Sequence, residues 1–104
     1  MFLQEYIEQK SSSFRKLCEA HHVRSIYAFG SSINNSFDPD KSDIDLVVEI
    51  DENDPIKRGN DLIGLWNNLE EFFRRKVDML TPSSIKNPVL QKTIDHSKVL
   101  IYER

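Results

Sequence analysis

Residues 42–50 read SDIDLVVEI, which is the clearest β-strand pattern in the chain. Successive side chains of a strand point to opposite faces of the sheet. Four apolar side chains of this stretch therefore share one face, which must belong to the core: Ile44, Leu46, Val48 and Ile50. Asp43 and Asp45 share the other face at the start of the strand, about 7 Å apart at their Cα atoms for a rise of about 3.3 Å per residue.

Two like charges at neighbouring positions of one face repel each other and gain nothing from burial. A divalent cation is the simplest compensation, because hard cations such as Mg²⁺ prefer carboxylate oxygens and keep positions open for water and substrate phosphates. The alternative is a solvated strand entrance, in which Asp43 completes the turn begun by Asp38-Pro39.

Upstream of this strand, a second strand pattern over residues 23–29 ends at Gly30-Ser31. Glycine permits close backbone approach or a positive φ. The N–H groups that follow it, together with the serine hydroxyl, could cradle a phosphate as the start of a helix does. An isolated Gly-Ser is more simply a turn that ends a strand. Upstream of an Asp-x-Asp, however, a Gly-Ser would add a phosphate-binding element to the metal-binding carboxylates.

The remaining patterns alternate between helical and strand periodicity, which favours an α/β or α+β domain over residues 1–104. Serines 11–13 weaken the first expected helix and could split it. Asp54-Pro55 is a good helix start, because aspartate caps the first turn and proline tolerates its first position. The expected elements are helices over about 1–20, from 55 onward and over 89–96, and strands over 23–29, 44–50, 77–80 and 99–102. One face of the second helix carries Leu62, Leu65, Trp66, Leu69 and Phe73.

Composition excludes several classes of protein. The 104 residues carry 14 Lys and Arg against 17 Asp and Glu, a net charge of -3, which argues against a dedicated nucleic-acid binder. No apolar run approaches the roughly 20 residues of a membrane span, and no signal peptide is visible. The single cysteine, Cys18, rules out an internal disulfide and is expected to fill core space. A cytoplasmic location is therefore expected.

Together, Phe29-Gly30-Ser31 and Ser42-Asp43-Ile44-Asp45-Leu46-Val47-Val48 resemble the signature of the minimal (MNT) branch of the DNA polymerase β-like nucleotidyltransferases. The intervening segment, residues 32–42, is one residue longer than is usual there, in a loop where added length costs little. The family's third carboxylate lies on a later strand, and Asp78 in KVDMLTP (residues 76–82) matches it. Without the first two aspartates, Asp78 would be read as a surface residue beside Arg74, Arg75 and Lys76.

The resemblance implies an α+β fold with a small mixed sheet and two-metal phosphoryl transfer. It implies that Asp43 and Asp45 hold Mg²⁺ ions on the phosphates of ATP. Asp78 would bind the metal that activates an acceptor hydroxyl, or would act as its base. Gly30 and Ser31 would position the β- and γ-phosphates, and pyrophosphate would leave as the α-phosphate is attacked.

Lone domains of this branch resemble antitoxins paired with a HEPN-type ribonuclease toxin, to which they transfer AMP at a tyrosine hydroxyl. The size of the chain agrees with a protein acceptor, since 104 residues leave no second domain to hold a bulky one. Two alternatives stay open: a non-catalytic module that neutralises its partner by contact, and a nucleotidyltransferase that modifies a small molecule. Nucleic acid is not expected as a direct partner.

Other metal-binding patterns are weaker. Residues 38–49 place oxygen ligands at some positions of a calcium loop, but Asp43 stands where that loop needs glycine. No two of His21, His22 and His96 stand four residues apart as a helical pair of metal ligands would, so a solvated junction is the expected role of the adjacent pair.

Overall fold

The computed structural model describes residues 2–33 and 43–104. The loop expected at residues 34–41 lies outside the described residues. So do residues 38–42, the first five positions of the calcium-loop pattern, and the side chain of Ser31. In the described part, helices and strands follow the order expected from the sequence.

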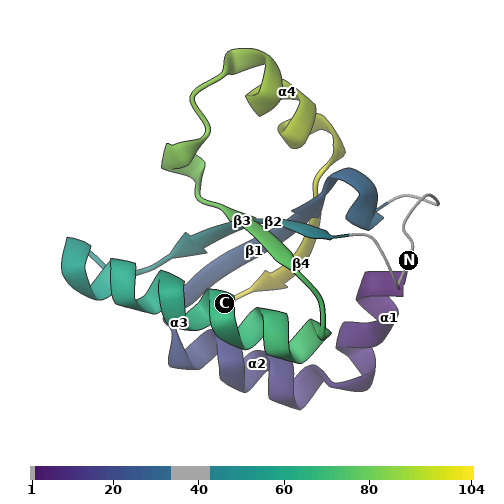
Figure 1. Ribbon diagram of the computed structural model, residues 1–104, viewed down its shortest axis with the longest axis vertical. Helices are drawn as coiled ribbons and strands as arrows, with labels where there is room; N and C mark the ends of the chain where they lie inside the picture. Colours follow the sequence, from purple (N-terminus) through teal and green to yellow (C-terminus); the bar gives the residue numbers. More distant parts are fainter. Residues whose placement is uncertain (1, 34–42) are drawn as a thin grey trace.

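A four-stranded mixed sheet forms the centre of the molecule, in the order β3-β2-β1-β4 (Figure 1). Its strands are β1 (Val23–Phe29), β2 (Ile44–Ile50), β3 (Val77–Leu80) and β4 (Val99–Glu103). β1 is antiparallel to both β2 and β4, whereas β3 runs parallel to β2 at one edge. The prediction of an α+β domain with a small mixed sheet is therefore confirmed.

Three of the four α-helices cover one face of this sheet, and the fourth lies on the other side (Figure 1). They are α1 (Phe2–Gln9), α2 (Ser11–Ala20) and α3 (Pro55–Phe73) on the first face and α4 (Pro88–Ser97) on the second. The first helical segment is interrupted at Lys10, directly before the three serines, so the predicted split of this helix is confirmed. None of the helices in the described ranges is both long and apolar enough to cross a membrane.

The core lies between the sheet and the first three helices. On the inward face of β2, Ile44, Leu46 and Val48 are fully buried, whereas Ile50 at the end of the strand is only partly buried. Cys18 is also in the core, which confirms the expected packing role of the thiol. Burial raises the pKa of Cys18 to about 12, so this side chain stays a thiol at neutral pH.

The start of α3 is capped as predicted: the Asp54 carboxylate accepts hydrogen bonds from the N–H groups of Ile56 and Lys57. At the other end of α3, the Tyr6 hydroxyl of α1 donates to the Phe72 carbonyl at 2.7 Å. The C-terminal end of α3 is thus bonded to α1, directly before the chain turns into β3.

Candidate active site

Two of the predicted carboxylates lie opposite each other on adjacent strands. Asp45 of β2 and Asp78 of β3 are register partners, because the two strands are parallel and begin at the same end of the sheet. The Ile44 N–H donates to the Lys76 carbonyl at 3.0 Å, which fixes this register at its first residue. Asp45 is half-buried, whereas Asp78 is exposed. Asp43, directly before β2, is also half-buried and close enough for its charge to act on Asp45.

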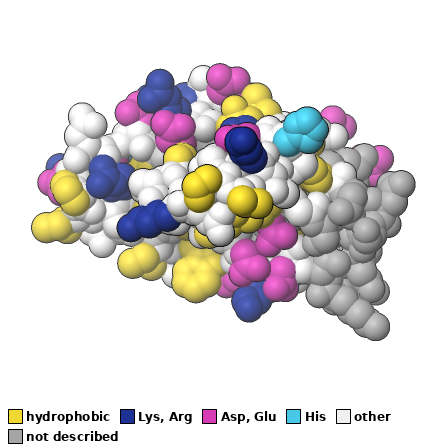
Figure 2. Space-filling view, turned by 90° about the horizontal axis from the view of Figure 1, so that it is seen from above, with side chains coloured by type: hydrophobic (Ala, Val, Ile, Leu, Met, Phe, Trp, Pro, Cys, Tyr) yellow, Lys and Arg dark blue, Asp and Glu magenta, His cyan; other side chains and the backbone are white. Residues whose placement is uncertain are grey.

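The carboxylates occupy the face of the sheet opposite to the core formed by α1, α2 and α3. Val77 is buried in that core, so the next residue, Asp78, points to the other face, where α4 lies. Figure 2 views the molecule from the α4 side and shows acidic side chains at several places on this view, with one group of them below the centre. Among the described residues, none of the helices covers Asp78, whose side chain is exposed on this face.

Gly30 brings the end of β1 against the same carboxylates. It has a φ of +64°, in the left-handed region, where the chain leaves β1 and enters a short 3₁₀ turn over Gly30–Ile33. A Cβ at this position would lie 2.6 Å from Oδ2 of Asp45, which is closer than real Cβ contacts come. The left-handed backbone therefore favours glycine, and any larger residue at this position would displace the Asp45 carboxylate.

The electrostatics of Asp45 follow from this crowding. Burial raises the pKa of Asp45 to about 6, and the Asp78 charge, a hydrogen bond with Asp78 and the Asp43 charge act in the same direction. Between about pH 4 and pH 6, the metal-free site therefore retains a proton that an isolated carboxyl would lose. A bound divalent cation would offset the same repulsion, and three carboxylates supply the hard oxygen ligands that Mg²⁺ prefers. The residues present thus fit the implied metal.

The raised pKa of Asp45 predicts a pH-dependent stability. Because this carboxyl has a higher pKa in the folded protein than in the unfolded chain, the folded protein binds more protons between about pH 4 and pH 6. The free energy of unfolding therefore decreases, and the fold becomes less stable, as the pH rises through this window. We expect Asp45→Asn to raise the melting temperature of the metal-free protein at about pH 8 and to change it little at about pH 4.

Thermal unfolding of both proteins in a chelator, followed by circular dichroism across this pH range, measures the difference. A melting-temperature difference that is the same at both ends of the range would contradict the assigned pKa.

The structure also brings together a group that the sequence did not suggest. One ligand atom each of His22, Glu52 and Asp61 lies within 4.8 Å of the other two, and Nδ1 of His22 lies 3.0 Å from an Asp61 oxygen. His21 instead packs against α3, with its Nε2 2.7 Å from the Asn68 amide nitrogen. The two histidines thus lie at the junction between α2 and β1, as expected. Each also has a partner on α3, and the spacing of residues in the sequence did not reveal these contacts.

Trp66 departs from the predicted apolar face of α3. Leu65, Leu69 and Phe73 of that face are buried, but Trp66 is 42% exposed. Its indole N–H donates to the Val77 carbonyl at 2.9 Å, so the ring lies along the outer edge of β3 rather than in the core. Helical periodicity groups these residues correctly, but it does not distinguish a core contact from a contact with a strand edge.

Comparisons with known proteins show which family the chain resembles. Residues 11–101 match the family model of the nucleotidyltransferase domain. Two relatives from Methanocaldococcus jannaschii, both named "Putative protein adenylyltransferase", are 38% and 34% identical over 87 and 85 residues. The first alignment covers 84% of this chain and 85% of the relative, and the second covers 82% and 83%.

Two solved structures share the fold. One, described as a toxin-antitoxin with AMP-PNP, has a TM-score of 0.59 at 25% identity, over 89% of this chain and 73% of the other. The second, a tri-AMPylated Shewanella oneidensis HEPN toxin in complex with MNT antitoxin, gives 0.56 at 23%, over 93% and 72%. The extent of the family match and the identity to the curated relatives decide the classification. The chain belongs to the nucleotidyltransferase domain family.

Proposed function

We propose that this nucleotidyltransferase transfers AMP from Mg-ATP to a tyrosine hydroxyl of a HEPN-type toxin, and so acts as its antitoxin. The observation that carries the proposal is the pairing of Asp45 with Asp78 on adjacent parallel strands, with the Gly30 backbone against Asp45. Relatives named as protein adenylyltransferases support the reaction, and a similar chain from a toxin-antitoxin complex with AMP-PNP supports both the nucleotide and the kind of partner.

In this proposal Asp43 and Asp45 hold Mg²⁺ on the nucleotide phosphates, and Gly30 and Ser31 position the β- and γ-phosphates. When bound, the metal neutralises charge on the phosphates and on the leaving pyrophosphate. Asp78 is exposed beside Asp45, which suits it to contact the incoming acceptor and receive its hydroxyl proton. The acceptor oxygen forms its bond to the α-phosphorus as the bond to the bridging oxygen breaks, and pyrophosphate leaves. Because the reaction consumes ATP, we propose the cytoplasm as its location.

The test is to incubate the purified chain with Mg-ATP and the HEPN protein encoded beside it. We expect the intact mass of the HEPN protein to increase by whole AMP units, the added group to lie on tyrosine, and its ribonuclease activity to fall. Omission of Mg²⁺ should abolish the mass increase.

The matched control is the double variant Asp43→Asn/Asp45→Asn. If this variant still inhibits the ribonuclease fully, and no AMP appears on the HEPN protein with the wild-type chain, the chain neutralises its partner by contact and the proposal is wrong.

A further inference from the structure

The outer edge of β3 is held by α3, at the residue next to Asp78. β3 has only four residues and pairs with β2 alone, so one side of its backbone faces away from the sheet. Lys76 faces β2, since its carbonyl accepts from Ile44, and the N–H and C=O of Val77 therefore point to the free edge. Unpaired edge groups of this kind are available for pairing with another segment.

Two side chains of α3 satisfy both of these backbone groups. Glu70 Oε2 accepts from the Val77 N–H at 2.9 Å, and Trp66 Nε1 donates to the Val77 carbonyl at 2.9 Å. Trp66 and Glu70 are four residues apart and thus neighbours on one face of the helix. Together they supply the acceptor and the donor that a further strand would otherwise offer to Val77.

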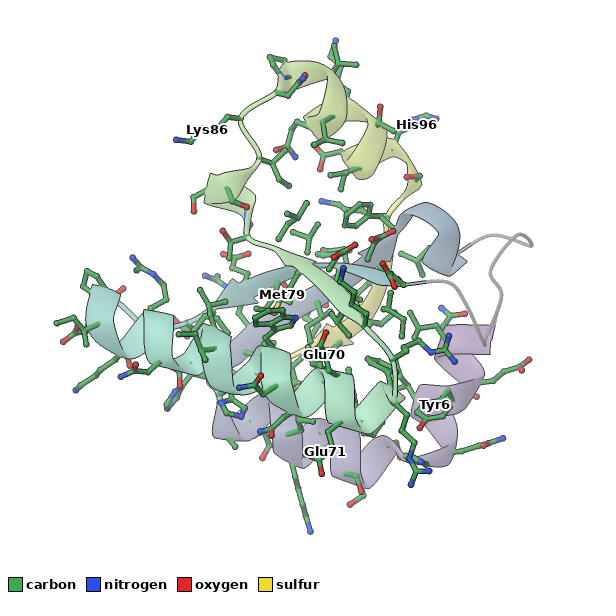
Figure 3. All side chains as sticks on the ribbon, viewed as in Figure 1. Tyr6, Glu70, Glu71, Met79, Lys86 and His96 are labelled. Atoms are coloured by element: carbon green, nitrogen blue, oxygen red, sulfur yellow. The ribbon has the colours of Figure 1, made fainter. Side chains whose placement is uncertain are left out.

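Figure 3 shows Glu70 on the side of α3 that faces the sheet, near Met79 of β3, and Glu71 on the opposite side of the helix. The Glu70 carbonyl also accepts from the N–H groups of Arg74 and Arg75, which connect α3 to β3. Glu70 therefore binds the α3–β3 connection through its backbone carbonyl and binds β3 through its side chain.

We infer that Trp66 and Glu70 are positioning residues, which fix Val77 so that Asp78 stands opposite Asp45. This inference rests on the proposed function, in which Asp78 contacts the acceptor. A shift of β3 by one residue would turn Asp78 to the other face of the sheet. Smaller displacements also matter, since misplacing a reacting group by about 1 Å can cost about 100-fold in rate.

The variants distinguish the effect of the hydrogen bonds from the effect of side-chain size. Glu70→Ala removes the acceptor, Glu70→Gln retains an acceptor oxygen without the charge, and Trp66→Phe removes the donor but keeps an aromatic ring. Glu71→Ala is the matched control, because Glu71 is exposed on the other side of the same helix.

We expect Glu70→Ala to lower kcat for AMP transfer at least about tenfold with KM for ATP nearly unchanged, because the nucleotide side of the site is intact. Exchange of the Val77 amide hydrogen, followed by NMR, should accelerate at least about tenfold. Trp66→Phe should lower kcat in the same direction. Glu70→Gln should retain most of kcat, and Glu71→Ala should match the wild type.

The inference is overturned if Glu70→Ala keeps the wild-type kcat although the Val77 amide exchanges faster, or if Glu70→Gln loses as much activity as Glu70→Ala. A wild-type chain that transfers no AMP would instead contradict the proposed function. In that case Mn²⁺ titration decides: weaker binding by Glu70→Ala, matching Asp78→Asn, supports the positioning role, and unchanged binding overturns it.

Discussion

Replacement of Asp78 by asparagine is expected to lower AMP transfer by about 1000-fold or more, with the fold retained. Asparagine has the same shape but cannot accept the hydroxyl proton or offer a charged oxygen to a cation. Asp78 is exposed, so its replacement leaves no buried polar group unsatisfied. The same loss is expected for Asp43→Asn and Asp45→Asn, which remove the carboxylates proposed to hold Mg²⁺ on the nucleotide.

Single-turnover transfer to the HEPN protein measures the loss, and circular dichroism verifies the fold. Glu49→Gln is a suitable control, because Glu49 is an exposed acid of β2 four residues from Asp45 and on the same face of the sheet. Transfer near the wild-type rate by any of the three aspartate variants would show that the assigned carboxylates do not carry the reaction.

The second large effect is expected from Gly30→Ala. An alanine Cβ would lie 2.6 Å from Oδ2 of Asp45, at a φ of +64°. The left-handed backbone alone costs about 1–2 kcal/mol for a residue with a Cβ. The clash also displaces the Asp45 carboxylate, and a displacement of about 1 Å is enough to reduce transfer about 100-fold. We therefore expect both a lower melting temperature and a loss of activity in the folded fraction.

Gly59→Ala is the matched control for this substitution. Gly59 lies within α3, and, apart from its chain neighbours and the adjacent helix backbone, no heavy atom of the described residues lies within 4 Å of a Cβ built there. Alanine is the better helix former by about 0.8–1 kcal/mol, so this variant should melt at a higher temperature and keep full activity. A Gly30→Ala protein with wild-type stability and transfer would contradict the close packing of the β1 turn on Asp45.

The features predicted well are those that depend on neighbours in the chain. The alternation of residues 44–50 predicted β2 and its buried face, and Asp54-Pro55 predicted the capped start of α3. The serines at 11–13 predicted that the first helical segment could divide, which it does at Lys10. Strand alternation, capping and helix breaks arise within a few residues of one another, so a local pattern contains the information that decides them.

The surroundings of α3 show where such patterns fail. Trp66 has the spacing of a core residue, yet it lies at the edge of β3. Glu70 has no distinguishing neighbour in the sequence, and its contact with Val77 depends on how the helix returns against the strand. A partner that is chosen by packing leaves no periodic signal.

The amino-acid sequence alone was sufficient to identify β2 with the two aspartates at its start, the strand that carries the third aspartate, and the glycine that follows β1. The folded molecule was needed to learn that Asp78 meets Asp45 in register, that Gly30 touches the Asp45 carboxylate, and that α3 holds Val77. The reason is physical. Side-chain alternation is a property of each strand, whereas register and close approach depend on packing among segments that are distant in the chain.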